Sequence, residues 1–225
     1  DGAISGTKLP VADGDCADFA VVSALDGAGE LRLYLVDLDH DGVAATTVNS
    51  MDPSRPQARL EFAGAPAQPL GEAGEHDLAT LLDRAAVLIA FEQIGGCQAA
   101  MEMGIAYTKE RYAFGRPVAS FQAIKHKFAD MFVAIELARS NAYYGACALS
   151  SDAPDLPLAA ATARVSATDA YYMVSKETLQ AHGGMGFTWE FDCHLFYRRA
   201  QLLSTVIGAQ PTWKEHVASR LLQAA

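Results

Sequence analysis

The spacing of hydrophobic and polar positions divides the chain into two parts. Residues 1–70 carry short apolar runs at Phe19–Ala24, Leu31–Val36 and Ala58–Phe62, which are broken by turn residues such as those at 39–42. Short runs between glycine- and aspartate-containing turns predict antiparallel β-strands. A few strands alone make a poor core, and the sequence starts without methionine, so we expect this part to belong to a larger β-domain.

From about residue 76 the apolar residues recur every three or four positions, which is the period of an amphipathic helix. Leu78–Arg111 contains no proline and predicts one helix of roughly nine turns, about 50 Å long. The further helices that we expect are a second from Pro117 or Ser120 to about Ser150, a third over Leu158–Ala181, a fourth over Trp189–Thr205 with Thr188 as its N-cap, and a fifth that starts at Pro211. Long helices with short connections form an antiparallel bundle.

The predicted class is therefore α+β, with a partial antiparallel β-domain over residues 1–72 and a helical domain over residues 73–225. The composition is that of a folded protein, with 51% hydrophobic and 20% charged residues. Lys and Arg number 17 against 27 Asp and Glu, so the net charge is −10. An acidic chain of this kind argues against nucleic acid as a partner, because phosphates require basic surface.

The cysteines and the apolar stretches bear on metal sites and membranes. Cys16, Cys97, Cys147 and Cys193 have neither a CxxC spacing nor a zinc-ligand pattern. We therefore expect reduced thiols in a cytoplasmic protein, with no metal. The longest apolar stretches, such as Ala85–Phe91, are far shorter than the roughly 20 residues of a membrane-spanning helix.

The first segment with binding chemistry is Arg111–Pro117, where two arginines flank a glycine just before a proline-initiated helix. A helix N-terminus and arginine side chains both favour an anion, and Phe114 offers a face to a planar ring. A helix–helix turn with two solvated arginines explains the same residues, so the pattern alone leaves both interpretations open.

The second segment is His182-Gly183-Gly184-Met185-Gly186, at the end of the third predicted helix. Its glycines would let the backbone approach a ligand closely, but glycines also simply end helices. His182 fits a capping or packing role better than an acid–base role. The hydroxyl and imidazole side chains form no recognisable nucleophile–base motif.

Taken together, several strings resemble those of the acyl-CoA dehydrogenases. They are Glu92–Gly96, Tyr107–Pro117, Ser120–His126 with Ala129–Met131, and Gln180–Glu190, while Ser5–Lys8 followed by Ala17-Asp18 resembles the family's middle β-domain. The resemblance covers essentially the whole chain. It implies part of the middle β-domain followed by the C-terminal four-helix domain, without the family's N-terminal helical domain or the first part of its β-domain.

The resemblance implies a flavoprotein subunit that oxidises acyl-CoA thioesters to 2-enoyl-CoA, with FAD as cofactor and electron-transfer flavoprotein as a partner. By similarity, six residues would contact the adenine and diphosphate end of FAD: Arg111, Phe114, Gln122, Gln180, Gly183 and Gly184. We call these six residues the ADP clamp. In this family the clamp commonly serves the FAD whose flavin ring lies in the neighbouring subunit, so we expect a homo- or hetero-tetramer.

The chain departs from the family at the positions that carry the catalytic glutamate. Counting from Arg198-Arg199 places Ile207 at the usual position, and counting back from Arg111 places Ala85 at the alternative one. Neither side chain can accept a proton, so the catalytic base is unknown.

Two β-domain positions depart as well. Pro10 and Ala12 stand where the family has an aromatic residue and a threonine beside the flavin ring. Asp83, Glu190 and Asp192 are reserve candidates for the base, although capping of a helix explains the last two better.

Three functions remain open from the sequence. The leading one is an acyl-CoA dehydrogenase-type subunit that shares FAD with a partner subunit, as in some actinobacterial enzymes of steroid side-chain β-oxidation. The second is a self-sufficient acyl-CoA dehydrogenase, for fatty acids or steroid side chains, whose base lies elsewhere. The third is a degenerate scaffold that binds no flavin.

Overall fold

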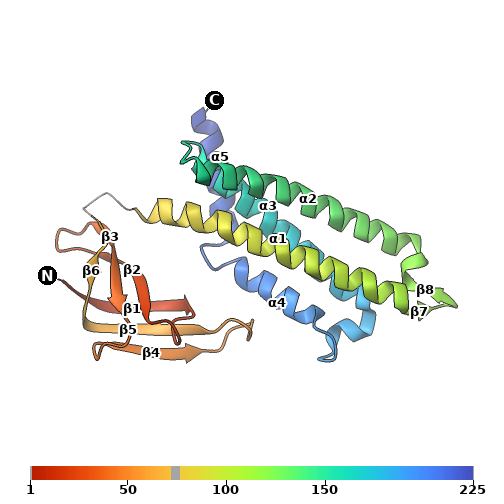
Figure 1. Ribbon diagram of the computed structural model, residues 1–225, viewed down its shortest axis with the longest axis horizontal. Helices are drawn as coiled ribbons and strands as arrows, with labels where there is room; N and C mark the ends of the chain where they lie inside the picture. The colour runs from red at the N-terminus through yellow and green to blue at the C-terminus, as the bar shows by residue number, and fades with distance from the viewer. Residues whose placement is uncertain (1, 72–76, 225) are drawn as a thin grey trace. The chain divides into compact units, whose positions relative to one another are not determined.

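The computed structural model describes residues 2–71 and 77–224, and the chain divides into two compact units, Asp1–Leu81 and Leu82–Ala225. Figure 1 shows strands in the first unit and helices in the second, so the class is α+β as predicted. The expected domain boundary between residues 72 and 73 lies outside the described residues.

The first unit contains two three-stranded antiparallel sheets, with strand orders β1-β5-β4 and β2-β3-β6. The strands are β1 (Ala3–Ala12), β2 (Phe19–Leu25), β3 (Leu31–Asp37), β4 (Val43–Val48), β5 (Gln57–Pro66) and β6 (Gln68–Pro69). Both sheets contribute to one apolar core, in which Ile4, Leu60 and Phe62 pack with Val22 and Val36. The buried positions alternate along β5, as expected of a strand with one face on a core.

The three predicted strands are confirmed as β2, β3 and β5, and residues 39–42 form the expected turn. The sequence did not indicate β1 or β4. β1 has irregular register between Ile4 and Ser5 and between Lys8 and Val11, which breaks the alternation that marks a strand. In β4 most residues are exposed, so it has no apolar face to detect.

The second unit is a helical bundle in which long helices run side by side (Figure 1). Its elements are α1 (Leu78–Glu110), β7 (Tyr112–Ala113), β8 (Arg116–Pro117), the 3₁₀ helix η1 (Val118–Ser120), α2 (Gln122–Ser150), α3 (Leu156–His182), the 3₁₀ helix η2 (Gly183–Phe187), α4 (Cys193–Leu203) and α5 (Gln210–Ala224). The prediction of one near-continuous first helix is confirmed.

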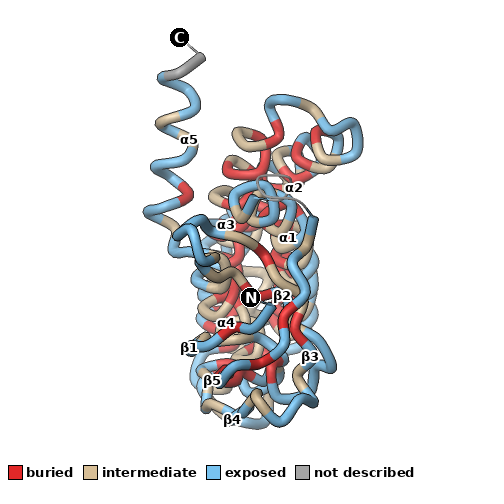
Figure 2. Tube along the Cα trace, turned by 90° about the vertical axis from the view of Figure 1, so that its left-hand side faces the viewer, coloured by how far each residue is buried: buried red, intermediate tan, exposed pale blue. Residues whose placement is uncertain are grey.

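The bundle core is built largely of small side chains. Ile94 and Met101 of α1 pack with Met131 and Ile135 of α2 and with Tyr171 of α3, and alanines fill the spaces between them. Figure 2 shows buried residues recurring along the helices between exposed ones, as amphipathic helices require.

Two predicted helix starts are wrong. The second helix does not begin at Pro117 or Ser120, because η1 intervenes and α2 starts at Gln122. The fourth begins at Cys193 rather than Trp189. Thr188 is not its N-cap, because the Thr188 hydroxyl donates to the carbonyl of Met185 (2.9 Å) and the residue ends η2.

Candidate functional site

The segment after α1 forms a tight hairpin that the sequence did not predict. β7 and β8 pair through Tyr112 with Pro117 and Ala113 with Arg116, so Phe114 and Gly115 make a two-residue turn. Both turn residues have positive φ, 52° and 78°, which is the geometry that joins two twisted strands most easily. Glycine adopts this geometry freely, but a phenylalanine does so only at a cost of about 1 kcal/mol or more.

The strained Phe114 is also the most exposed large apolar side chain of the described residues, at 96%. Its ring meets Phe121 only edge-on, with 6.3 Å between centroids, while the guanidinium of Arg116 lies 4.0 Å over the Phe121 ring. A bulky aromatic held in a costly conformation and left in solvent gains little for folding. The arrangement instead favours a ring that waits for a ligand.

Arg111 and Gln122 flank this hairpin. The Arg111 backbone is fixed, since its N–H donates to the Tyr107 carbonyl (2.8 Å) and its carbonyl accepts from the Val118 N–H (2.8 Å), while the residue itself is exposed. Gln122 is the first residue of α2, and its amide Nε2 donates to Nε2 of His126 (3.1 Å). The guanidinium of Arg111 is therefore presented to solvent by a well-anchored main chain.

The glycines after α3 differ in what they are needed for. Gly183 ends the helix with φ 61°, and a Cβ at Gly183 or Gly184 would meet nothing within 4 Å. At Gly186, in contrast, a Cβ would lie 2.4 Å from the carbonyl oxygen of Leu179. Gly186 is therefore required by packing, whereas Gly183 and Gly184 border open space that a ligand can enter.

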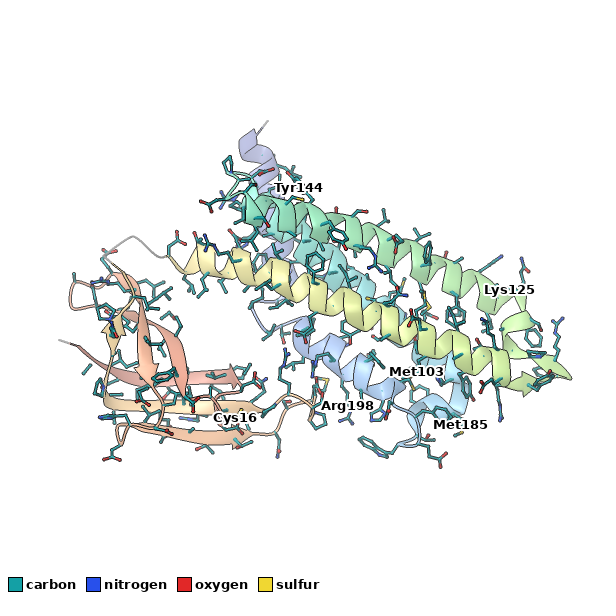
Figure 3. The ribbon with its side chains drawn as sticks, viewed as in Figure 1. Cys16, Met103, Lys125, Tyr144, Met185 and Arg198 are labelled. Carbon is teal, nitrogen blue, oxygen red and sulfur yellow. The ribbon has the colours of Figure 1, made fainter. Side chains whose placement is uncertain are left out.

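One ring contact brings the two predicted segments to the same end of the bundle. Tyr107, one turn before Arg111, stacks on His182 with 4.3 Å between ring centroids. His182 is buried and its Nδ1 donates to the Thr178 carbonyl (2.8 Å), which confirms the expected packing role. The segments that carry Arg111 and Gln180 thus lie at one end of the bundle, and Figure 3 shows Met185 of η2 and Lys125 of α2 at this end.

The two positions predicted to correspond to the family's base both carry apolar side chains. Ala85 is half-buried on α1, and Ile207 packs against a cluster that includes Ala86, Val87 and Trp213. The Trp213 indole Nε1 donates to the Ile207 carbonyl (3.2 Å), which fixes the backbone here. Neither position offers a group that could take a proton.

A buried arginine fixes the start of the loop that follows α4 and carries Ile207. Arg164 donates from Nη1 to Oε1 of Gln93 (3.1 Å) and from Nη2 to the carbonyl of Leu203, the last residue of α4. Burial lowers the pKa of Arg164 to about 10. A cation at the C-terminal end of a helix is favourable, and here it holds the loop that carries Ile207.

The reserve candidates for the base are scattered. Asp83 is half-buried near the start of α1, whereas Glu190 and Asp192 are exposed in the turn before α4. Asp192 occupies the N-cap position of α4, but its side chain makes no capping hydrogen bond there. Glu92 of α1 forms an ion pair with Arg199 (Oε1 to Nη1, 2.9 Å). No sequence motif indicated this contact.

Within residues 2–71 and 77–224, no group of three or more His, Cys, Asp or Glu side chains is arranged to hold a metal ion. None of the helices described is both long and apolar enough to cross a membrane. All four cysteines are free thiols, with Cys97 and Cys193 buried and Cys16 and Cys147 exposed.

Comparison with known proteins gives one consistent result. The family model "Acyl-CoA dehydrogenase, C-terminal domain" matches residues 72–222. The chain is 38% identical over 191 residues to acyl-CoA dehydrogenase IpdE2 of Mycobacterium tuberculosis, which covers 84% of this chain and 53% of that protein. The chain thus spans about half the length of this curated relative.

Solved structures agree in fold. The Tcur3481-Tcur3483 steroid ACAD G363A variant superposes with a TM-score of 0.90 at 29% identity, over 99% of this chain and 60% of that one. Butyryl-CoA dehydrogenase from Megasphaera elsdenii gives a TM-score of 0.91 at 26% identity, over 98% of this chain and 60% of that one.

Proposed function

The chain belongs to the acyl-CoA dehydrogenase family, and from this premise we propose that it is a cofactor-sharing subunit of an acyl-CoA dehydrogenase. In this proposal it binds the adenosine diphosphate end of FAD but does not itself take a proton from the substrate. One observation carries the proposal: ADP-clamp residues are open to solvent at one end of the bundle, while Ala85 and Ile207 are both apolar.

The residues present fit one half of FAD. The exposed ring of Phe114, the guanidinium of Arg111 and the open space beside Gly183 and Gly184 suit an adenine joined to a diphosphate. On β1, Pro10 and Ala12 offer neither a flat aromatic face nor a hydroxyl for a flavin ring. The fit therefore favours a chain that holds the ADP end of a cofactor whose flavin ring is bound elsewhere.

When bound, FAD supplies the acceptor for the hydride that leaves the β-carbon of an acyl-CoA thioester. The α-proton has to go to a carboxylate, and because positions 85 and 207 are apolar we infer that a homologous partner subunit supplies it. The role of Arg111 and Phe114 is to bind and orient the cofactor. Electron-transfer flavoprotein would take up the electrons afterwards.

The similarity to the acyl-CoA dehydrogenase IpdE2 supports an acyl-CoA substrate, of a steroid side chain or a fatty acid. The similarity to a structure named for two components and a steroid supports a hetero-oligomer, most simply a hetero-tetramer. A cytoplasmic setting stays a prediction of the sequence.

The test is to purify the full-length protein alone and with its homologous partner, and to measure flavin absorbance and turnover for each. We expect flavin in the complex and dehydrogenation only when the partner is present. Full activity without a partner would show that this chain carries its own base. A complex that contains no flavin would instead support the scaffold that binds no flavin.

A further inference from the structure

A recess of about 490 Å³ lies on the helical unit beside Gln180 of the ADP clamp. Besides Gln180, its wall includes Lys127 of α2, Lys176 and Glu177 of α3, Phe187 of η2 and Tyr197 of α4. Apart from Gln180, none of these residues belongs to the clamp that the sequence predicted. The recess therefore adds side chains of a different kind to the same region.

The recess carries positive charge, whereas the whole chain is negatively charged. Lys127 forms an ion pair with Glu177 Oε2, and the Lys176 Nζ lies 3.6 Å from Oε1 of the same carboxylate. Partial burial raises the pKa of Glu177, but the hydrogen bond and charge of Lys127, together with Lys176, outweigh it and hold that pKa below its usual value. Two lysines thus share one carboxylate, so the recess carries an excess positive charge on a chain of net charge −10.

An aromatic side chain completes the wall. Phe187 is 78% exposed, directly after the glycines of η2, and the half-buried Tyr197 also lines the recess. An exposed phenyl ring beside excess positive charge suits a ligand that combines a flat ring with an anion. Neither feature is needed to bury apolar surface in the bundle.

We propose that this recess extends the ADP clamp, with Lys127 and Lys176 binding a phosphate group of the adenosine diphosphate end of FAD and Phe187 contacting its ring. This assignment rests on the FAD-sharing function proposed above. Glu177 then competes with the phosphate for the two ammonium groups and lowers their affinity for it.

Binding of FAD to the full-length protein with its partner subunit tests the assignment, by titration of flavin fluorescence at low salt. Lys127→Gln, Lys176→Gln and Phe187→Leu should each weaken binding by about five- to tenfold. Glu177→Gln should tighten binding by about two- to fivefold, because it removes the only negative charge of the recess lining. At about 1 M salt the effects of all three charge changes should shrink.

The opposite effects expected of Lys127→Gln and Glu177→Gln on FAD affinity distinguish a binding role of these residues from a structural one. Lys127→Gln and Glu177→Gln break the same ion pair, so a merely structural role would move both in the same direction. Lys176→Gln leaves that pair intact and serves if either of the other variants folds poorly. Lys125→Gln is the matched control, because Lys125 is an exposed lysine of α2 outside the recess lining, and it should change nothing.

The possible failures are distinguishable. If Arg111→Ala weakens FAD binding but the two lysine variants do not, or if Glu177→Gln weakens it, the recess is not part of the site and this inference is overturned. If the wild-type complex binds no FAD, the proposed function itself fails, and the assignment of the recess fails with it.

Discussion

At one end of the helical bundle the side chains are polar, aromatic and open to solvent, and one of them, Phe114, is held in a left-handed conformation. At the other end, Ile207 lies among apolar side chains and the backbone around it is held by hydrogen bonds from Trp213 and Arg164. The first end has exposed side chains that folding does not need, whereas these contacts around Ile207 serve folding. The proposed function therefore separates cofactor binding from proton transfer within one family scaffold.

The largest expected effect is on the rate of dehydrogenation, compared between the isolated chain and the complex. Without a partner, the FAD-loaded full-length protein should dehydrogenate an acyl-CoA about 10²- to 10⁴-fold more slowly than the complex, because it lacks a positioned base. Substrate-dependent bleaching of flavin absorbance measures this. A normal rate without the partner would show that the base has been misplaced, and Asp83 and Glu190 would be the first residues to replace.

Trp213→Ala should lower the free energy of unfolding by about 3–5 kcal/mol, since it empties a buried site and removes the hydrogen bond to Ile207. Urea denaturation measures the change. Trp189→Ala is the matched control, because Trp189 is 74% exposed, and it should cost less than about 1 kcal/mol even with the loss of its contact to Arg198. Equal losses for the two tryptophans would contradict the contrast between the ends.

Arg111→Ala should weaken FAD binding by about 10- to 100-fold, because a charge-assisted hydrogen bond to a diphosphate contributes about 1.5–3 kcal/mol. Stability should barely change, since the residue is exposed. The control is Arg84→Ala. Arg84 is an exposed arginine near the start of α1, and its Nη2 lies 3.5 Å from Oδ1 of Asp152. An equal loss of flavin in both variants would show that position on the bundle does not matter.

Phe114→Gly should raise the free energy of unfolding by about 1 kcal/mol, because glycine adopts φ 52° without strain. The same change should weaken FAD binding through loss of the ring. Phe114→Ala separates the effects, since it loses the ring but keeps a Cβ at positive φ, so it should weaken binding without the gain in stability. A stability loss in the glycine variant would mean that the ring supports the fold.

The sequence predicted best where one physical signal dominates. The three-and-four spacing without proline placed α1 to within one residue of its observed end, and alternation found β2 and β3. The hairpin at Tyr112–Pro117 could not be predicted, because each strand has two residues and phenylalanine is an unfavourable residue for its turn.

The site shows the same limit. Residue types allowed an anion near Arg111 and favoured a packing role for His182, but nothing in the sequence gives the Tyr107–His182 stack that brings the two segments together. The cationic recess was missed because Lys127 of α2 lies 50 residues before Glu177 of α3 in the sequence. Contacts between distant segments carry no local signature.

The unbroken course of α1 has a consequence for how the chain can vary. The helix spans roughly seven turns, about 38 Å, between Ala85 and its end at Glu110, just before Arg111. It therefore fixes the distance between Ala85 and Arg111 of the ADP clamp.

The number of residues in a helix also sets the direction in which its side chains point. Removing one residue would turn everything beyond the deletion by about 100°, whereas removing seven would leave a mismatch of only about 20°. The length of α1 can therefore change only by numbers of residues close to a whole number of turns, such as seven or eleven, if Ala85 and Arg111 are to keep their relative orientation.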